Sequence, residues 1–462
     1  MAVGADAAFR QGIGFCDPED MMLFHTVSIA GSSRNGNHET KVYGDYDRPS
    51  ESDRKRAPVS YRFESDISRE AYEQFIEDCR MVSFTQSYAW SEVKSNWGHF
   101  HCGLYRDDVL VAVALILVKK VVAGIRFFYV PYGYVIDFEN KEDLAAMTDG
   151  VRRLAKRSHA YMVKLDPYFC ISDNSFRDED VEHLFSENHK IKHENLIGCG
   201  YKHQPLRPEM DKGFQARVQI AVPLCDRDGN RLTAEQLKKT CGRTGRYFEN
   251  YQTKRGVTFE ITDDPARIDD LVALLKETEK RKNIRLRNRE YFERLLASFK
   301  GYAYMGFGRI DLDRYYAFLQ NDPDTAPEKL QKVTALKEEK GSSVILSAAI
   351  FLLPRNREGI RVGEDLYAGN ALYLPGLQTP KALVFECCKF AMQKGCDYFN
   401  LNGVEGTLDD SLTTYKRNFN GRIMEFAGEY DLPTSLLYYP ISIGYSAMLT
   451  LYKRRNRKHP PA

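Results

Sequence analysis

A cluster of charged and aromatic residues follows a short apolar run near the C-terminal end of the sequence. The run, residues 398–401, leads into Asn and Gly residues and so predicts a strand that opens into a loop. The loop carries carboxylates, among them Glu405, and returns through the pair Tyr415 and Lys416. Clustered polar groups on a loop at the end of a buried strand are how α/β folds commonly build binding and catalytic sites. Without further information, a solvated surface loop explains the same residues equally well.

Three stretches of the sequence carry short motifs of mixed aromatic, acidic and glycine residues. The first, 400–430, contains N-L-N-G-V-E-G, then Y-K-R-N-F, then E-F-A-G-E-Y. The second, 86–94, reads Q-S-Y-A-W-S-E-V-K. The third joins F-Y-V-P-Y-G-Y-V-I-D at 128–137 to V-K-L-D-P at 163–167. In wording, order and spacing these motifs resemble the FemABX family of peptidoglycan-bridge aminoacyltransferases, from about residue 61 to the end of the chain. The first motif is most similar to the branch that adds the first bridge residue.

The resemblance implies an enzyme that moves an amino acid from aminoacyl-tRNA to the stem peptide of a cell-wall precursor. Lys416 then lies near the donor site, and Tyr415 binds substrate by packing beside the terminal adenosine of the tRNA. Asp137 matches an acidic position near the reacting amine of the acceptor, where a carboxylate can orient that amine or accept its proton. We therefore predict Lys416 and Asp137 as catalytic residues and expect neither a metal ion nor a cofactor.

The acceptor implied by the resemblance carries a diphosphate, which needs cations from more than one element. Lys94 ends the second motif and matches a family lysine that contacts these phosphates. Arg281 lies in a segment that resembles the family's E-T-x-x-R, and the forked donors of an arginine suit phosphate oxygens. A solvated helix face is the alternative, because further cations crowd the same stretch: Lys280, Lys282, Arg285, Arg287 and Arg289.

Four more residues are predicted to bind substrate because they occupy motif positions. Tyr132 lies in the P-Y-G-Y turn, in which Tyr134 stands where the family often has Pro. Glu405 belongs to N-L-N-G-V-E-G, and Glu429 belongs to E-F-A-G-E-Y. Tyr367 begins Y-A-G-N and matches an aromatic residue that faces the cleft, although an ordinary strand residue is an equal alternative.

The elements that must hold these residues are predicted in the same order twice along the chain, as helix, helix, three strands, helix and strand. The first copy has helices at 68–80, 88–96 and 141–159 and strands at 100–106, 110–119, 126–130 and 161–165. The second copy has helices at 266–282, 290–299 and 379–394 and strands at 302–309, 343–353, 365–369 and 398–401. A repeat on this scale indicates two copies of one α/β unit. The order fits tandem N-acetyltransferase-like (GNAT) domains, which is also the fold that the resemblance implies.

The repeat suggests a division of the chain into domains. Residues 1–60, rich in Gly, Ser, Asp and Arg, are predicted to form a disordered tail. We expect the first domain at 61–175 and the second at 176–426, and the resemblance implies that 427–462 returns to complete the first. The second domain contains a charged, helix-prone insertion at 311–341. This insertion is too short for the long helical arm that some relatives carry.

Composition narrows the class of protein. A chain of 462 residues exceeds the size at which a single core stops growing, so two domains are the default. The net charge of +2 means that any contact with nucleic acid depends on a local basic patch. Ten cysteines at irregular spacings predict reduced thiols, and we expect neither a signal peptide nor a membrane span. The sequence therefore predicts a cytoplasmic protein, and we expect a monomer.

The densest basic cluster of the sequence is the C-terminal stretch 452–459, which reads Y-K-R-R-N-R-K-H. Near an anionic leaflet each such cation contributes about 1 kcal/mol, so the stretch can hold the protein at the inner face of the membrane. A disordered basic end is an equal alternative.

The resemblance implies an aminoacyltransferase that adds Ser, Ala or Gly from aminoacyl-tRNA to the diamino acid of lipid II or of a UDP-linked muropeptide. An N-acyltransferase with another acyl donor and a non-catalytic cell-wall scaffold remain open alternatives. The Gly-rich loop that holds the pyrophosphate of an acyl-CoA is absent from both copies. No Walker loop, H-E-x-x-H or G-x-S-x-G motif occurs either, so NTP hydrolysis, zinc proteolysis and serine hydrolysis lack support.

Overall fold

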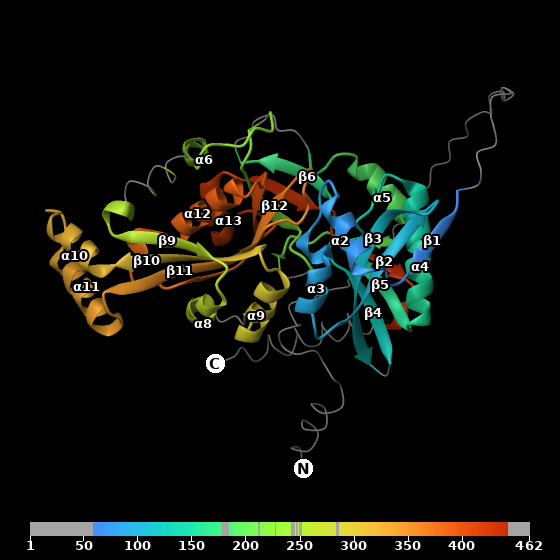
Figure 1. Cartoon of the computed structure of the whole chain (residues 1–462), viewed down its shortest axis with the longest axis horizontal. Helices are drawn as coiled ribbons and strands as arrows, with labels where there is room; N and C mark the ends of the chain where they lie inside the picture. The colour runs from blue at the N-terminus through green and yellow to red at the C-terminus, as the bar shows by residue number, and fades with distance from the viewer. Residues whose placement is uncertain are drawn as a thin grey trace, which may run out of the picture.

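The computed structural model describes residues 59–441, apart from residues 123, 177–183, 211–212, 227, 242–244, 246–247, 249–251 and 283–285 (Figure 1). Nearly all of the predicted N-terminal tail, the basic stretch at 452–459 and Arg285 lie outside the described residues. Within the described part of the chain, no helix combines the length and the apolar character that a bilayer crossing requires.

Seven strands form the first sheet, drawn mostly in blue and cyan in Figure 1. In order across the sheet they are β1 (Tyr61–Glu64), β2 (Gly98–Arg106), β3 (Val109–Val122), β4 (Ile125–Val130), β5 (Ala160–Leu165), β15 (Tyr430–Pro433) and β7 (Lys202–His203). Only β4 and β5 are parallel neighbours. Their ladder shifts register between Arg126 and Phe128 and then reaches the pair Val130↔Leu165, the last residues of both strands, so this parallel pair stays closed to its end.

Eight strands form the second sheet. In order they are β6 (Cys170–Ser175), β14 (Arg422–Phe426), β8 (Val218–Pro223), β13 (Tyr398–Val404), β12 (Val362–Asn370), β11 (Ser343–Leu352), β10 (Ala303–Asp311) and β9 (Val257–Thr262). Here β12 and β13 are the parallel neighbours, and the other pairs are antiparallel. Each sheet therefore has one parallel pair among antiparallel strands.

Helices pack against both sheets. The α-helices that the argument uses are α2 (Arg69–Glu77), α3 (Tyr88–Val93), α4 (Lys141–Arg157), α5 (His189–Gly198), α6 (Ala234–Thr240), α8 (Ile268–Lys282), α9 (Arg289–Ser298), α10 (Leu312–Gln320), α11 (Pro327–Lys340), α12 (Thr379–Gln393) and α13 (Ser411–Lys416). Because strand side chains alternate between faces, Ile350 and Leu352 of β11 pack toward α8, whereas Ala349 and Phe351 pack toward α12. The cluster that contains Ile350 also contains Leu115 of β3, so one hydrophobic core joins the two sheets.

The two halves of the molecule also meet through α3 and α9, which lie next to each other near the centre of Figure 1. The ring of Phe299, which follows α9, lies 6.2 Å from that of Phe84 and 6.5 Å from that of Trp90 in α3, measured between centroids. These aromatic contacts fix the helix that ends at Lys94 against the second half of the chain.

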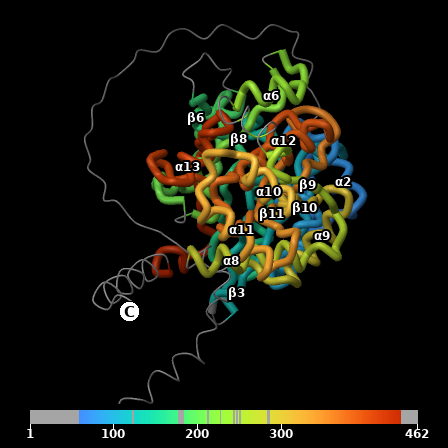
Figure 2. The backbone as a smooth tube through the Cα atoms, turned by 90° about the vertical axis from the view of Figure 1, so that its left-hand side faces the viewer, coloured from blue at the N-terminus to red at the C-terminus, as the bar shows by residue number. Residues whose placement is uncertain are grey.

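The insertion between β10 and β11 folds as the helix pair α10 and α11, at the end of the molecule that faces the viewer in Figure 2. The Asp311 carboxylate accepts two backbone hydrogen bonds of 3.0 Å and so begins α10. Val333 and Leu336 of α11 are buried with Tyr315 and Leu319 of α10. The predicted short helical insertion in the second unit is confirmed.

Every helix and strand predicted in the two copies is present, with ends within a few residues of the predicted ones. The repeat predicts nothing between 166 and 262, where the structure has β6 to β9 together with α5 and α6. These strands widen the two sheets beyond the repeated unit, so the comparison of the two copies could not reveal them.

The chain passes between the sheets on both sides of the expected boundary at residue 175. β6, which precedes the boundary, lies in the second sheet, and β7, which follows it, lies in the first. β15, which follows residue 427, lies between β5 and β7. Dividing the chain at one residue cannot separate the two sheets. We therefore propose two domains, each defined by the strands of one sheet.

Candidate active site

The parallel strands β12 and β13 of the second sheet part midway along their length. Their ladder ends at the pair Glu364↔Asn400. Beyond that point, β12 continues against β11 and β13 continues against β8. Residues 365–370 of β12 and 401–404 of β13 thus diverge, and we call the place where they part the strand opening. Backbone groups on the two diverging edges are not used by a ladder between these strands.

Lys416 reaches the strand opening from the end of α13. The carboxylate of Asp410 accepts backbone hydrogen bonds of 2.7 and 3.0 Å and fixes the first turn of this helix. Lys416 is 6% exposed, and its Nζ donates to the carbonyl oxygens of Asn402 (2.9 Å) and Gly403 (2.7 Å). Burial lowers the pKa of Lys416 to about 8, against the opposing effect of the Asp365 and Asp410 carboxylates. An ammonium that can lose its proton near neutral pH therefore lies against β13.

Asp365 lies on the opposite side of the strand opening, on β12. Its main-chain oxygen accepts a hydrogen bond from the side chain of Asn402. Burial raises the pKa of the Asp365 carboxyl to about 6, and the Lys416 ammonium opposes this shift. The buried Oδ1 of Asp365 has no hydrogen-bond partner among the described residues. Tyr415 packs next to Phe419, with ring centroids 5.9 Å apart, and burial followed by the nearby Asp365 charge raises its pKa.

A cavity of about 470 Å³ lies beside the first sheet, and we call it the aromatic cavity. Two of the predicted site residues, Tyr132 and Asp137, line it. Asp137 is exposed, and its Oδ1 accepts a hydrogen bond of 2.9 Å from the backbone N of Glu139. The wall combines rings with charged groups: Phe75, Phe138, Tyr168, Arg80, Glu187 and Lys192. A cavity of this size with apolar walls and a few polar groups suits a small ligand or part of a larger one.

Tyr132 is held in an unusual backbone conformation at the edge of the aromatic cavity. Its φ is 56°, in the left-handed region, and the side chain is 4% exposed. Its backbone N donates to Asp166 Oδ1 (2.8 Å), and its hydroxyl accepts from Gln219 Nε2 (2.6 Å). The next residue, Gly133, also has a positive φ of 74°, and a Cβ there would lie 2.9 Å from the Cα of Pro167. The P-Y-G-Y motif is thus explained by a tight turn.

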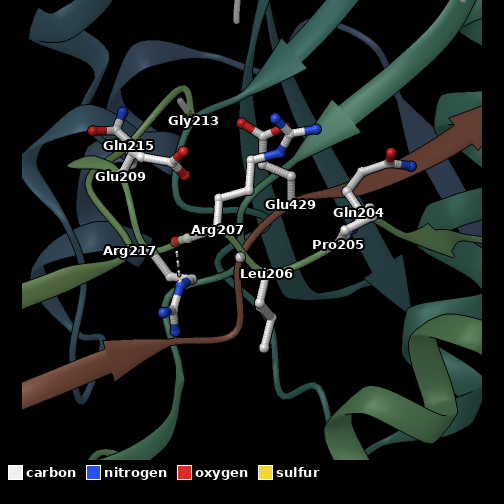
Figure 3. A pocket seen from close by; sticks show the side chains of 10 residues that line it. Gln204, Pro205, Leu206, Arg207, Glu209, Gly213, Gln215, Arg217 and Glu429 are labelled. Carbon is white, nitrogen blue, oxygen red and sulfur yellow. Dashed lines mark hydrogen bonds between the residues drawn. The ribbon is translucent and has the colours of Figure 1, made fainter. Parts of the chain in front are cut away.

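Glu429 lines a separate cavity of about 40 Å³, large enough for a few water molecules at most (Figure 3). Its Oε2 lies 2.7 Å from Lys164 Nζ, and its Oε1 accepts from the backbone N of Phe214 (2.6 Å). Figure 3 shows the Arg207 side chain beside that of Glu429. Burial lowers the pKa of Arg207, against the effect of the Glu209 and Glu429 carboxylates. Both carboxylate oxygens of Glu429 therefore already have partners inside the protein.

Glu405 and Tyr367 belong to the strands that border the strand opening. Glu405 directly follows β13, and its Oε2 accepts a hydrogen bond of 2.9 Å from the backbone N of Met210. Tyr367 lies on β12 and is half-buried, with its ring 5.4 Å from Phe292 and 6.0 Å from Tyr291, between centroids. Tyr367 thus packs on α9, as an ordinary strand residue also would.

Lys94 and Arg281 lie at the ends of two different helices. Lys94 follows α3, and its Nζ lies 5.2 Å from the ring centroid of Trp90. Arg281 is exposed in the last turn of α8, and its Nη1 donates to the carbonyl oxygen of Asn370 (2.8 Å) at the end of β12. Their roles as a phosphate clamp remain predictions.

Most of the predicted site residues fall into two groups. Those around the strand opening are Lys416, Tyr415, Tyr367 and Glu405. Those at the aromatic cavity are Tyr132 and Asp137. Arg281 contacts the diverging part of β12 through the carbonyl oxygen of Asn370, whereas Lys94 and Glu429 belong to neither group. Among the residues that the structure describes, no group of His, Cys, Asp and Glu could hold a metal ion.

Buried polar residues that the sequence analysis does not single out connect these groups. Glu364 is 3% exposed, and burial raises the pKa of its carboxyl to about 8, against the hydrogen bond of 3.2 Å that Asn400 Nδ2 donates to it. Gln219 is 1% exposed and accepts from Asn400 Nδ2 at 2.6 Å. Adjacent carboxylates, Glu364 and Asp365, inside an otherwise apolar strand are the signal that points to this site from the sequence alone.

Comparisons with known proteins agree on one family. The FemAB family model matches residues 67–344 and 318–444. A lipid II:glycine glycyltransferase of Staphylococcus aureus is 23% identical over 406 residues, which cover 79% of this chain and 91% of that protein. The crystal structure of FemX is similar with a TM-score of 0.66 and 20% identity, and the match covers 83% of this chain and 99% of that one. A tandem GNAT protein of clavulanic acid biosynthesis matches with a TM-score of 0.42 and 6% identity over 82% and 99% of the two chains. The predicted fold class, tandem GNAT-like units, is confirmed.

Proposed function

Because the chain belongs to the FemAB family, we propose that it transfers an amino acid to the stem peptide of a peptidoglycan precursor, with lipid II as the acceptor. The name of the S. aureus relative, a lipid II:glycine glycyltransferase, supports this acceptor and this class of reaction. The structural observation that supports the proposal most is Lys416, a buried ammonium held against the backbone of the strand opening.

We propose that the strand opening receives the donor. The donor is an aminoacyl ester, which we take to be aminoacyl-tRNA. The diverging edges of β12 and β13 offer backbone N–H and C=O groups to an extended ligand, in the manner of an added strand. Lys416 Nζ then turns from the carbonyl oxygens of Asn402 and Gly403 toward the carbonyl oxygen of the donor ester. There its charge stabilises the oxyanion of the transition state.

The reaction requires little acid–base chemistry from the protein. The amine of the acceptor attacks the ester carbonyl carbon, a C–N bond forms, and the C–O bond to the ribose breaks. The ribose oxygen leaves with the electron pair of that bond and takes up the proton that the amine loses. The protein must mainly bring the two reactants together and stabilise the developing negative charge.

The aromatic cavity is the proposed site for the stem peptide of the acceptor. A stem diamino acid carries a cationic amine, and the carboxylates of Asp137, Glu139 and Glu187 give the cavity groups that attract it. Lys94 and Arg281 are the proposed contacts of the diphosphate. Arginine suits this role because its planar donors pair with two phosphate oxygens at once.

Further details of the proposal follow from the motifs. The transferred amino acid is small, namely Ser, Ala or Gly, and the enzyme works as a cytoplasmic monomer. The basic stretch at 452–459, outside the described residues, brings it to the inner face of the membrane, where a lipid-linked acceptor resides.

The test is transfer from radiolabelled seryl-, alanyl- or glycyl-tRNA to purified lipid II, with the product identified by mass spectrometry. We expect one added residue on the stem diamino acid and a loss of transfer in Lys416→Met. A protein that leaves lipid II unchanged with all three donors, or a Lys416→Met variant with full activity, would contradict the proposal.

A further inference from the structure

A continuous chain of hydrogen bonds joins the aromatic cavity to the strand opening. It begins at the Tyr132 hydroxyl, which accepts from Gln219 Nε2 (2.6 Å). Gln219 Oε1 accepts from Asn400 Nδ2 (2.6 Å), and Asn400 Oδ1 accepts from the backbone N of Asn402 (2.8 Å). The carbonyl oxygen of Asn402 accepts from Lys416 Nζ (2.9 Å). Four hydrogen bonds thus lead from a wall of one predicted site to the ammonium of the other.

The two side-chain amides in this chain cannot reverse without losing bonds. The second hydrogen of Gln219 Nε2 goes to the carbonyl oxygen of Ala216 (2.9 Å), and the second hydrogen of Asn400 Nδ2 goes to Glu364 Oε2 (3.2 Å). Both donors of each amide are therefore used, and each oxygen accepts. A flipped Asn400 would place its NH₂ against the N–H of Asn402 and its oxygen against the oxygens of Gln219 and Glu364, which is costly in a buried site.

The backbone of β13 explains how this chain of hydrogen bonds acts on Lys416. The pairing of β13 with β8 shifts register between Asn400 and Gly403, and Asn402 has a φ of 63°. This irregularity turns the carbonyl oxygens of Asn402 and Gly403 toward the same ammonium. A left-handed non-glycine residue persists only where its surroundings hold it. The Asn400 side chain helps to hold it here, through the backbone N of Asn402, together with the hydrogen bond that the Asn402 side chain donates to the main-chain oxygen of Asp365.

We propose that Gln219 and Asn400 are positioning residues that fix Lys416 in the strand opening and tie its position to Tyr132 in the aromatic cavity. The inference deepens the proposed function and rests on it for the identity of the reaction. The geometry of Lys416 itself does not depend on that identity, so it can be tested without any substrate.

The first experiment measures how readily the Lys416 amine reacts. Trace acetylation with an N-hydroxysuccinimide ester, followed by mass spectrometry of the peptide that contains Lys416, gives a rate for the wild-type chain and for each variant. Asn400→Leu and Gln219→Leu remove the amides with little change of volume. We expect Lys416 to react about fivefold faster in Asn400→Leu, the factor that corresponds to the loss of one net hydrogen bond, and by a smaller factor in Gln219→Leu.

A matched control is Gln252→Leu. Gln252 is also 1% exposed, and its Nε2 donates to the carbonyl oxygen of Leu377 (2.9 Å), which is not part of the chain to Lys416. The control loses a buried glutamine bond of the same kind, so we expect it to leave the Lys416 rate unchanged. A milder variant, Tyr132→Phe, removes only the terminal hydroxyl while Gln219 keeps its bond to Ala216. It should shift the rate slightly in the same direction, even if the leucine variants do not fold.

Asn400→Asp tests whether the hydrogen bond to Asn402 matters more than the shape of the side chain. Aspartate retains an oxygen that can accept from the Asn402 N–H. We therefore expect Asn400→Asp to bring the Lys416 rate back toward that of the wild type. A rate in Asn400→Asp as high as in Asn400→Leu would overturn the role given to this bond.

The second experiment follows transfer to lipid II. A positioning role predicts that Gln219→Leu and Asn400→Leu lower kcat by about fivefold to tenfold, since geometry in the transition state is lost, while the KM for the acceptor stays constant. A rise of KM alone would overturn the inference, because the residues would then serve binding. The inference would also be overturned if Lys416 reacted at the wild-type rate in both Asn400→Leu and Gln219→Leu. The same holds if its rate rose in Gln252→Leu as much as in those two variants.

The two experiments separate failure of the inference from failure of the proposed function. If the wild-type chain transfers no amino acid but the Lys416 rate responds as expected, the positioning of Lys416 by Asn400 stands and the proposed reaction falls. If transfer occurs and neither the Lys416 rate nor kcat responds, the reaction stands and the positioning role is wrong.

Discussion

Among the described residues, one buried lysine lies beside the parallel strand pair of each sheet, and the two lysines differ in what surrounds them. Lys164 lies on β5, in the pair that stays closed to its end, and its Nζ is 2.7 Å from both Glu429 Oε2 and Asp431 Oδ1. Lys416 lies where β12 and β13 part, and its Nζ donates to two neutral carbonyl oxygens. A lysine thus forms ion pairs in one sheet, whereas in the other sheet a lysine ammonium is hydrogen-bonded to neutral carbonyl oxygens.

The pKa shifts of the two lysines follow from these surroundings. Burial alone would lower both. At Lys164 the carboxylates of Asp431 and Glu429 outweigh burial, and the pKa is raised. At Lys416 burial prevails over Asp365 and Asp410, and the pKa falls to about 8. We therefore propose a stabilising role for the lysine of the closed pair and, with the proposed function, a chemical role for the lysine of the parted pair.

The largest expected effect tests the structural half of this comparison. Lys164→Met removes the ammonium that lies 2.7 Å from the buried carboxylates of Glu429 and Asp431, and breaking a buried ion pair in this way destabilises a protein by about 3–5 kcal/mol. We expect a clear fall in melting temperature, measured by calorimetry, and a loss of activity only in proportion to the folded fraction. A variant that melts with the wild type but transfers nothing would reverse the roles assigned to the two lysines.

Lys416→Met tests the second half of this comparison, the proposed chemical role of the lysine at the strand opening. We expect kcat for transfer to fall roughly 10²–10³-fold, the range for loss of one group that stabilises an oxyanion. The folded pKa, about 8, lies below the unfolded value of 10.5, so the unfolded chain binds more protons between these pH values and wild-type stability rises with pH across that window. Lys416→Met removes the cost of burying the ammonium, so the variant should be more stable than the wild type. This gain in stability should be greatest below pH 8 and should vanish above pH 10.5. Melting curves at pH 7 and pH 10 measure it, and a variant less stable than the wild type at pH 7 would break the comparison.

Glu364→Gln sharpens the comparison because Glu364 belongs to the last residue pair before β12 and β13 part. Its folded pKa of about 8 lies above the ordinary value of 4.5, so the folded protein binds more protons between pH 4.5 and pH 8 and loses stability as pH rises through that window. Glutamine resembles the neutral acid and removes this loss. We expect the free energy of unfolding of Glu364→Gln relative to the wild type to rise from pH 5 to pH 8 by about 3–4 kcal/mol, followed as a relative rise in melting temperature. A pH-independent difference would show that Glu364 is not held neutral.

The smallest expected effects concern cations outside both lysine sites. Lys94→Ala and Arg281→Ala should raise the KM for lipid II by about tenfold with little change in kcat, because a phosphate clamp binds ground state and transition state alike. With a soluble stem peptide that lacks the diphosphate, the variants should match the wild type. Equal losses on both acceptors would mean that the Arg281 bond to Asn370 matters for structure alone.

The sequence predicts much of the scaffold because its signals are local. Apolar periodicity within each copy is enough to place β3, α4 or β11, and their ends lie within a few residues of the predicted ones. Lys416 and Tyr132 were predicted from motifs, and the structure gives physical reasons for both positions. Lys416 closes a helix that begins at Asp410, and Tyr132 occupies a left-handed turn before Gly133.

What the sequence does not reveal depends on contacts between distant segments. Gln219 lies in the run V-Q-I-A-V-P, where a polar residue in an alternating strand normally faces solvent. Its burial is set by Tyr132, 87 residues earlier, and by Asn400, 181 residues later. The opposite pKa shifts of Lys164 and Lys416 likewise depend on which carboxylates the fold brings near them. No local pattern encodes either fact.

The join between β14 and β15 has a consequence for how the protein is made. Residues 427–429 carry the chain from the second sheet directly into the gap between β5 and β7 of the first. A ribosome therefore releases β5 and β7 long before the strand that pairs with both. The edge of β5 stays unpaired while the strands of the second sheet, β6 to β14 apart from β7, are synthesised. We expect a chain stopped at residue 426 to expose the edge of β5 to hydrogen exchange and to self-associate, whereas a chain that includes Tyr430–Pro433 protects it. β15, the last strand within the described residues, thus completes the first sheet that began to form.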